Sequence, residues 1–231
     1  MSRTLTVLGL GRMSYPEALT LQRTLANARI DGSIDRDMLL LVEHPHVVTL
    51  GRSFRPENLP TPPEALAARG ITMHDIERGG DVTYHGPGQL VGYPIYHLSE
   101  HQQDLHVFLR QIEEALIRAL SYFGIDAGRQ PGLTGVWTGG RKIASIGIHV
   151  KKWVTWHGFA LNVSTDLSYF DLIVPCGIEN VVMTSVRREL GARTPRDCWA
   201  QALDYVVLGF SDVFGQQPQA GLIEELVGEQ P

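Results

Sequence analysis

The stretch from Arg78 to Ile95 constrains the fold of this chain more than any other. It holds five glycines and two prolines within eighteen residues, with Thr83, Tyr84 and His85 between them. Glycine reaches backbone conformations that other residues avoid, and proline fixes one dihedral angle and removes an N–H donor, so an unusual backbone path is predicted. Glycines alone are equally compatible with simple tight turns. The stretch lacks the Gly-Lys-Ser/Thr ending of a P-loop and opens no helix, which argues against the common nucleotide-binding loops.

The apolar patterns around this stretch predict helices and strands in a mixed order. Helices are expected over residues 16–28, 105–123, 196–210 and 222–227, with Gly124 as a stop signal, and strands over residues 38–50, 71–76, 90–96, 136–150 and 153–163. Residues 54–63 are a predicted loop, a Gln-rich turn follows residue 210, and the last two strands form a hairpin around Lys151 and Lys152. Because helices and strands do not alternate regularly, an α+β fold is predicted rather than a doubly wound sheet. The length suits one domain over residues 1–231.

Composition and charge argue against several classes of protein. The formal net charge is −5 and no dense lysine or arginine run occurs, so a nucleic-acid partner is not expected. The N-terminus has too short an apolar run for a signal peptide, and no stretch approaches the roughly 18 apolar residues of a membrane helix. Two cysteines in different contexts do not suggest a disulfide framework. A reducing, cytoplasmic compartment is therefore predicted.

The two cysteines differ in their surroundings. Cys176 lies in Leu-Ile-Val-Pro-Cys-Gly-Ile, where Pro175 and Gly177 predict a sharp turn at the end of an apolar strand. Cys198 lies in a stretch of helical period and is expected in the core, on one face with Ala202, Tyr205 and Val206. A cysteine is most often a small buried apolar residue, but the turn setting makes Cys176 the candidate nucleophile.

Lys142 is the candidate partner of Cys176. Strand alternation predicts that it lies on the same face as Ala144, Ile146, Ile148 and Val150. A lysine on an apolar face either extends its charge to water or has a specific role. An ammonium group beside a thiol favours the reactive thiolate. The pair is therefore predicted to act as nucleophile and activator.

The histidines give little indication of a metal site. His149 and His157 are of a type that binds metals, and His97 and His101 have the i, i+4 spacing of a helical pair. That pair precedes the predicted helix, however, and neither cysteine belongs to a Cys-x-x-Cys motif. No metal and no cofactor is predicted. Gly158, inside a predicted strand, indicates close approach of a ligand or of another backbone segment.

Five strings of residues, taken together, resemble the octanoyltransferase family of lipoate biosynthesis, also called lipoyl(octanoyl) transferases. They are Arg78-Gly-Gly-Asp-Val-Thr-Tyr-His-Gly-Pro-Gly-Gln-Leu, Gly135-Val-Trp, Lys142-Ile-Ala-Ser-Ile-Gly, His157-Gly-Phe-Ala-Leu-Asn-Val and Ile173-Val-Pro-Cys-Gly-Ile. The resemblance runs in order over residues 40–186, with no departure at the motif positions. The terminal segments carry no diagnostic match.

The resemblance implies a reaction, its partners and a fold. Such enzymes pass an octanoyl group from acyl carrier protein to a specific lysine on lipoyl domains of 2-oxoacid dehydrogenases and on the glycine-cleavage H protein. They need no ATP, because the transfer from thioester to amide is downhill. The implied fold is the catalytic module of biotin and lipoate protein ligases, with mixed β-sheets and flanking helices.

The resemblance also implies roles for individual residues. Cys176 carries the acyl group and Lys142 activates it. Three segments, residues 78–85, 145–147 and 158–160, bind substrate. Their residues are Arg78, Gly79, Gly80, Asp81, Val82, Thr83, Tyr84 and His85, then Ser145, Ile146 and Gly147, and then Gly158, Phe159 and Ala160. An apolar slot for the octanoyl chain is expected to include Tyr84, Ile146, Ile148 and Phe159.

Several points stay open at the level of sequence. Backbone amides near Gly147 or Gly177 are candidates to stabilise the oxyanion, and the sequence does not say whether His85, His149 or His157 assists proton transfer. Acidic protein partners favour a basic surface beside the site, for which the candidates are Arg187, Arg188 and Arg193 or the hairpin residues Lys151 and Lys152.

Three other functions compete with octanoyl transfer. An ATP-dependent lipoate or biotin protein ligase would use the lysine and would not need Cys176. A cysteine hydrolase would pair Cys176 with His85 or His157 and give the acyl group to water. A non-catalytic acyl-binding module is disfavoured because it has no use for a thiol.

Overall fold

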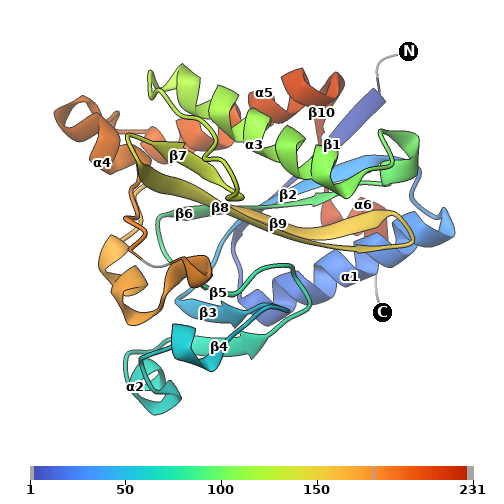
Figure 1. Ribbon diagram of the computed structural model, residues 1–231. Helices are drawn as coiled ribbons and strands as arrows, with labels where there is room; N and C mark the ends of the chain where they lie inside the picture. The colour runs from blue at the N-terminus through green and yellow to red at the C-terminus, as the bar shows by residue number, and fades with distance from the viewer. Residues whose placement is uncertain (1–2, 179, 228–231) are drawn as a thin grey trace.

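Two β-sheets form the centre of the protein, whose computed structural model describes residues 3–178 and 180–227 (Figure 1). The large sheet has seven strands in the order β10-β1-β2-β6-β9-β8-β7. Their bounds are β1 Arg3–Arg12, β2 Asp37–Glu43, β6 Gln89–Ile95, β7 Val136–Thr138, β8 Arg141–Lys151, β9 Val154–Asn162 and β10 Gln216–Ala220. The small sheet has three strands in the order β4-β3-β5, with the bounds β3 Val47–Leu50, β4 Thr72–Asp75 and β5 Val82–His85. Both sheets mix parallel and antiparallel pairs, as the predicted α+β class requires.

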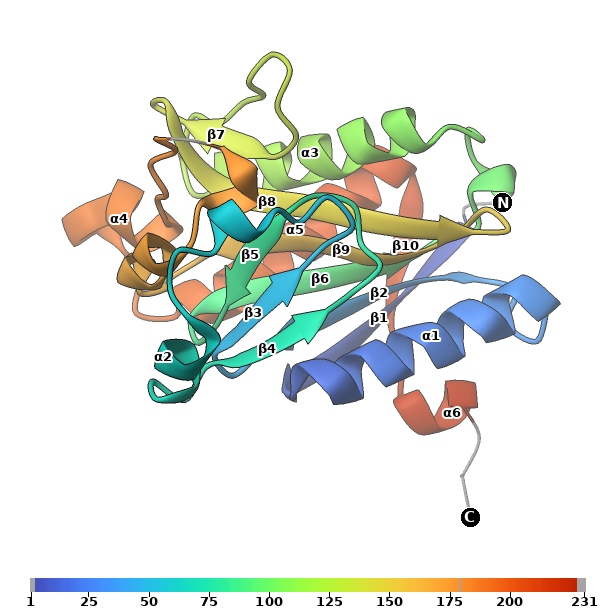
Figure 2. The ribbon, with the colours of Figure 1, turned by 60° about the horizontal axis from the view of Figure 1, so that its bottom comes forward.

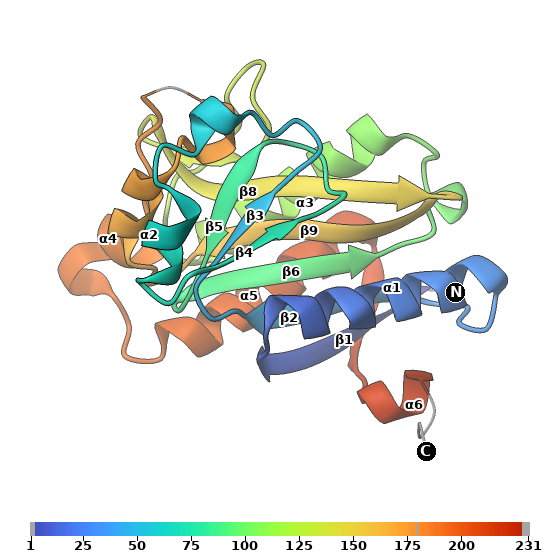
Figure 3. The same ribbon diagram turned by 90° about the horizontal axis from the view of Figure 1, so that it is seen from below.

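Helices cover both faces of the large sheet. The helices α3 (Leu105–Tyr122) and α5 (Cys198–Phe214) pack on one face, and α1 (Tyr15–Asp31) packs on the other. The small sheet lies beside α1, on the same side of the large sheet (Figures 2 and 3). Three short helices, α2 (Pro63–Ala67), α4 (Val186–Leu190) and α6 (Ile223–Val227), lie at the periphery.

The side chains of β2 show why this sheet needs two helical layers. Leu39 and Leu41 belong to the apolar cluster under α3 and α5, whereas Met38, Leu40 and Val42 belong to the cluster under α1. Successive strand residues point to opposite faces, so a strand buried on both faces consists of consecutive apolar residues. This is the pattern that the sequence shows.

Two of the three long helices that flank the sheet, α1 and α3, begin and end at recognisable signals. Ser14 caps α1 in a capping box with Glu17, and Gly32 ends that helix in the left-handed conformation. Asp104 accepts two backbone N–H groups at the start of α3. Gly124 has a φ of +70° just beyond α3, which confirms the predicted stop.

Most predicted elements are confirmed, and the exceptions have physical causes. The four helices, the strands over residues 71–76, 90–96 and 153–163, and the hairpin at Lys151 and Lys152 are all present. The predicted strand over residues 136–150 is instead two antiparallel strands, β7 and β8, because Gly139 and Gly140 turn the chain between them. The predicted strand over residues 38–50 is instead β2 and β3, which belong to different sheets, with Pro45 between them. The predicted Gln-rich turn is the strand β10, which tolerates Pro218 because it lies at a sheet edge. The strands β1 and β5 were not predicted.

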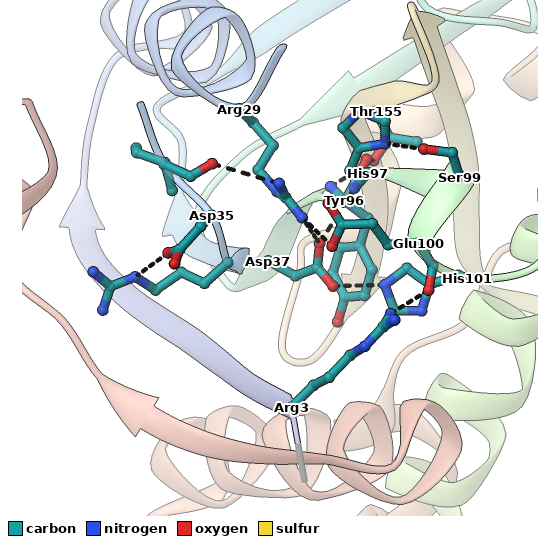
Figure 4. Close-up of polar contacts among 12 residues, drawn as sticks. Arg3, Arg29, Asp35, Asp37, Tyr96, His97, Ser99, Glu100, His101 and Thr155 are labelled. Atoms are coloured by element: carbon teal, nitrogen blue, oxygen red, sulfur yellow. Dashed lines mark hydrogen bonds and ion pairs between the residues drawn. The ribbon is translucent and has the colours of Figure 1, made fainter. Parts of the chain in front are cut away.

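A buried polar cluster ties β10, β2 and α1 together, and Figure 4 draws its members Arg29, Asp37 and His101. The carboxylate of Asp37 accepts from Gln216 Nε2 at 2.8 Å and lies 2.6 Å from His101 Nε2. Arg29, which is buried, pairs with Asp37 at 3.5 Å and with Glu100 at 2.6 Å. His101 therefore contacts a carboxylate in this cluster, and His97 Nδ1 lies 2.7 Å from the hydroxyl of Ser99.

Candidate active site

Cys176 lies on a turn with a backbone conformation that is rare for residues other than glycine. The turn is a short 3-10 segment, Pro175–Gly177, and Cys176 has a φ of +58°. The prediction of a sharp turn is confirmed, but the expected strand before it is wrong, because the 3-10 helix Leu167–Leu172 precedes Ile173 and Val174. A side chain held in the left-handed region carries strain that the surrounding structure must stabilise, and such strain is frequent at functional sites.

Lys142 approaches the thiol from β8. Its side chain is 1% exposed, and Nζ lies 3.4 Å from Cys176 Sγ. Ser145 on the same strand places its hydroxyl 3.7 Å from the sulfur. Nζ also lies 5.4 Å from the centre of the Trp137 ring, a distance at which an ammonium is attracted to the aromatic face. The predicted nucleophile and activator are thus brought together.

The backbone of Lys142 is hydrogen-bonded to the segment that follows the Cys176 turn. Lys142 N–H donates to Val182 O at 2.8 Å, and Thr184 N–H donates to Lys142 O at 2.9 Å. These two bonds form an isolated parallel bridge between Lys142 and Met183. The strand that carries the ammonium and the segment downstream of the thiol are therefore fixed to each other.

A β-bulge gives Lys142 a different orientation from the predicted one. The pairing of β7 with β8 shifts register between Val136 and Trp137, so Ile143 is an extra residue in β8. Strict alternation would place Lys142 and Ser145 on opposite faces, yet both side chains reach Cys176. The prediction that Lys142 shares the face of Ala144, Ile146, Ile148 and Val150 is wrong for this reason.

The cavity beside Cys176 has a volume of about 320 Å³. It is lined by every residue predicted for the site except Val82 and Tyr84. Those two side chains point to the opposite face of β5 and pack in the apolar core of the small sheet, where Tyr84 stacks on Tyr169 and bonds to His46. Alternation along β5 leaves Thr83 and His85 facing the cavity.

Glycines at two positions let backbone segments meet at the cavity. A Cβ on Gly158 would lie 2.1 Å from Gly92 O, which confirms the predicted close approach of another backbone segment. A Cβ on Gly147 would lie 2.7 Å from Gly79 O. These contacts exclude any larger residue and bring the Arg78–Gly80 loop against β8.

Several lining residues were not predicted. Tyr15 at the start of α1, Val91 and Tyr93 on β6, Leu109 on α3, residues 132–134 and Ile178 also line the cavity. Tyr93 belongs to the glycine-rich stretch, which was the one available signal for it. Tyr15 carries no local signal, because only the tertiary fold brings α1 to the site.

The polar groups of the cavity wall are mostly uncharged. Burial raises the pKa of Tyr15 and of Tyr93, and burial lowers the pKa of His85 to about 3. The hydroxyl of Tyr93 lies 2.7 Å from His44 Nε2, and that of Tyr15 lies 3.3 Å from His157 Nδ1. Neutral, mutually bonded side chains suit a wall that contacts an apolar ligand.

Among residues 3–178 and 180–227, no three His, Cys, Asp or Glu side chains are grouped to hold a metal ion. Within the same residues, no helix combines the length and apolar character needed to cross a membrane.

Comparison with known families decides the class of the protein. Residues 14–205 match the lipoyl protein ligase A/B catalytic domain family. The chain belongs to this family. Within it, an octanoyltransferase of Solibacter usitatus is 54% identical over 188 residues, covering 81% of this chain and 84% of the relative. An octanoyltransferase of Chloroflexus aggregans is 47% identical over 219 residues, covering 94% and 97%.

Solved structures of this ligase family share the fold. A bi-partite lipoate protein ligase of Thermoplasma acidophilum superposes with a TM-score of 0.70 at 20% identity, covering 99% of this chain and 91% of that one. A lipoate-protein ligase A bound with ATP also gives a TM-score of 0.70, at 21% identity, covering 99% and 94%. The predicted fold class and the predicted membership of the octanoyltransferases are confirmed, and the chain is an acyltransferase. Membership of this family supports octanoyl transfer for protein lipoylation.

Proposed function

We propose that this octanoyltransferase takes its acyl group from octanoyl-acyl carrier protein and passes it to a lysine of lipoyl domains through a thioester on Cys176. The acceptors are the lipoyl domains of 2-oxoacid dehydrogenases and the glycine-cleavage H protein. The observation that carries the proposal is the 3.4 Å approach of the buried Lys142 ammonium to Cys176 Sγ, beside a cavity for an acyl chain. A non-catalytic binder would need neither group.

The first half-reaction loads the enzyme. The Cys176 thiol gives its proton to solvent, and the thiolate, favoured by the Lys142 ammonium, attacks the carbonyl carbon of the donor thioester. A C–S bond forms to Cys176, the C–S bond to the carrier's phosphopantetheine breaks, and the departing sulfur takes up a proton. The Lys142 ammonium, 3.4 Å from Cys176 Sγ, can supply this proton and recover one from the acceptor amine in the second half-reaction.

The second half-reaction delivers the acyl group. The amine of the acceptor lysine attacks the acyl-Cys176 carbonyl, an amide bond forms, and the bond to Sγ breaks. The amine loses its extra proton and Cys176 returns as a thiolate beside the Lys142 ammonium. Splitting the transfer into two steps lets two bulky protein substrates bind one after the other.

Both half-reactions pass through a tetrahedral oxyanion that needs N–H donors. Two positions were candidates, Gly147 and Gly177. The Gly177 N–H already donates to Val174 O at 3.0 Å within the nucleophile turn. The backbone around Gly147 is therefore our choice for the oxyanion site.

The cavity offers apolar contact for the octanoyl chain. Ile146 and Phe159 line it, as predicted, whereas Tyr84 and Ile148 do not. Six methylenes at about 0.8 kcal/mol each would contribute on the order of 5 kcal/mol to binding. Val91 and Ala160 extend the apolar wall.

The test is the mass of the intact protein after incubation with octanoyl-acyl carrier protein and no ATP. We expect one octanoyl group on Cys176, lost again when a lipoyl domain is added and recovered on that domain. Cys176→Ala should gain no mass. A strict requirement for ATP would indicate a ligase instead, and release of free octanoate without an acceptor would indicate a hydrolase.

A further inference from the structure

The guanidinium of Arg78 is a buried positive charge that lines the cavity together with Cys176. Arg78 is 8% exposed. Its hydrogen bonds go to Thr49 O at 2.8 Å, to Thr49 Oγ1 at 3.0 Å and to Gly79 O at 3.1 Å. All three acceptors are neutral, and among the described residues no carboxylate forms an ion pair with Arg78. A buried charge is normally paired with an opposite one, so this arrangement requires an explanation.

A chain of neutral hydrogen bonds fixes Thr49 behind Arg78. Asn162 Nδ2 donates to Thr184 O at 3.0 Å, and its Oδ1 accepts from Gln89 Nε2 at 2.9 Å. Gln89 Oε1 then lies 2.8 Å from His85 Nδ1 and must accept a proton from it.

The same series of hydrogen bonds determines which atoms of His85 and Thr49 carry the protons. With Nδ1 protonated, neutral His85 keeps Nε2 as an acceptor, and the Thr49 hydroxyl donates to it at 3.5 Å. The lone pairs of Thr49 Oγ1 remain for Arg78. Burial lowers the pKa of His85 to about 3, which agrees with a neutral ring beside a cation. This series of hydrogen bonds orients the guanidinium of Arg78 without neutralising its charge.

The backbone around Arg78 is shaped to admit its side chain. A Cβ on Gly51 would lie 2.7 Å from Arg78 Nη1, and a Cβ on Gly147 would lie 3.2 Å from Arg78 Cδ. Burial lowers the pKa of Arg78, and nearby groups that can carry a negative charge, Cys176 and Asp81 among them, oppose this shift. The Asp81 carboxylate accepts from Asn58 Nδ2 at 2.6 Å and from Val82 N–H at 2.7 Å and forms no ion pair with Arg78 in the described part of the chain. Burial raises the pKa of both Tyr15 and Tyr93, so neither offers a charge.

We propose that Arg78, oriented by Thr49, is a second cation of the active site and stabilises the thiolate form of Cys176 together with Lys142. The charge that the surrounding structure leaves unpaired is then paired in the reactive state of the enzyme. Thr49 is a positioning residue, because it acts only through Arg78. The inference rests on the proposed role of Cys176 as nucleophile.

The test is the rate at which iodoacetamide alkylates Cys176 as a function of pH, followed by mass mapping of its peptide. Only the thiolate reacts, so the profile reports how far the site favours it. For Arg78→Met we expect a rate about tenfold lower at neutral pH and a midpoint about one pH unit higher, with rates that converge at high pH. Arg78→Lys should recover part of this loss, because it keeps the charge but not the planar fork.

Two variants of Thr49 separate orientation from charge. Thr49→Val keeps Arg78 but removes the hydroxyl, and a rate about threefold lower at neutral pH is expected. Thr49→Ser restores the hydroxyl and should return the profile towards that of the wild type. Thermal unfolding of each variant shows that it is folded, and the Thr49 pair decides the question if Arg78→Met does not fold.

Two outcomes would overturn the inference. One is an unchanged alkylation profile in folded Arg78→Met, and the other is an equal loss of rate at every pH, which would show a change of access rather than of charge. Alkylation needs no octanoyl donor. Failure of octanoyl transfer in the wild-type enzyme would therefore count against the proposed function and leave this measurement intact.

Discussion

One face of the large sheet is covered by α3 and α5, whose side chains Phe108, Leu116 and Phe210 form an apolar layer. The other face, towards α1 and the small sheet, borders a cavity where Tyr15, His85 and other polar groups are buried. The first face is stabilised by burial of apolar area, which tolerates exchanges between apolar side chains of similar volume. The second depends on hydrogen bonds, glycine contacts and rare backbone angles that must all be present together.

The two cysteines give the strongest test of this contrast. Cys198 belongs to the apolar layer and burial raises its pKa, whereas Cys176 lies 3.4 Å from an ammonium. Cys176→Ala should reduce octanoyl transfer by at least about 10³-fold while leaving the melting temperature nearly unchanged. Cys198→Ala, the matched control, should keep the rate and lose some stability. Full octanoyl transfer by Cys176→Ala would show that the active site does not lie on the cavity face.

Lys142 should have the next largest effect. Lys142→Ala should lower transfer by about 10²–10³-fold and move the pH profile of Cys176 alkylation upward, because the ammonium no longer favours the thiolate. Lys142→Arg should lose part of the activity, since it keeps the charge with a different geometry. Steady-state rates and alkylation together check this prediction. An unchanged alkylation profile would restrict Lys142 to a role on the substrate side.

The same substitution at two glycines, one on each face of the large sheet, tests the difference between the faces. A Cβ on Gly158 would lie 2.1 Å from Gly92 O at the cavity, and one on Gly209 would lie 2.2 Å from Ala115 O between α5 and α3. Both changes to alanine should cost about 3 kcal/mol of unfolding free energy. Only Gly158→Ala should also raise KM for the octanoyl donor. Gly9→Ala, with nothing within 4 Å of its Cβ, is the control for denaturation and kinetics alike. Equal kinetic effects at Gly158 and Gly209 would show that the two faces do not differ in their importance for substrate binding.

The cluster around Asp37 is a buried polar group of a different kind, because its charges are paired. Burial opposes ionisation of Asp37, but the hydrogen bond and charge of His101, together with hydrogen bonds from His97 and Gln216, lower the pKa of the carboxyl. The resulting stabilisation is complete above the ordinary carboxyl pKa and is lost as pH falls through the lowered value. Asp37→Asn should cost about 3 kcal/mol at neutral pH and flatten the decline of stability below about pH 4.

Urea unfolding measured across a pH series checks this prediction. The exposed Asp35 is the control, since its pair with Arg36 lies on the surface and should contribute little. A pH dependence that persists unchanged in Asp37→Asn would show that the acid sensitivity arises elsewhere.

The smallest effect is expected at the surface beside the nucleophile turn. Arg188 lines a groove with Pro175 and Ile178, and Arg187 and Arg193 are exposed nearby in the chain. Changing all three arginines to glutamine should raise KM for octanoyl-acyl carrier protein about threefold at low salt, because charge complementarity favours the encounter. Octanoyl-CoA should be used as before. The same change at Lys151 and Lys152 is the matched control, and equal losses with both donors would place the docking surface elsewhere.

The contrast between the faces also explains what could be predicted from the sequence. Helices α3 and α5 follow an apolar period, so their place in the core was readable, as was the core position of Cys198. The bulge at Ile143 could not be predicted, because an extra residue leaves no recognisable pattern within a run of apolar residues. Tyr15 and Thr49 joined the site through tertiary contacts between distant segments, which no local pattern encodes. Val82 and Tyr84 were misplaced because the segment was treated as one surface rather than as an alternating strand.

The pairing of β1 with β10 joins the two ends of the chain. Arg3 lies in register with Gln216 and Val7 with Ala220, so the edge of β1 waits for the last strand to be synthesised. At about 5–20 residues per second, a ribosome takes about 10–40 s to cover the intervening chain. During that interval β1 presents an open edge able to pair with another nascent chain. The edge of β1 is therefore covered only after β10 has been synthesised, whatever has already folded around Cys176.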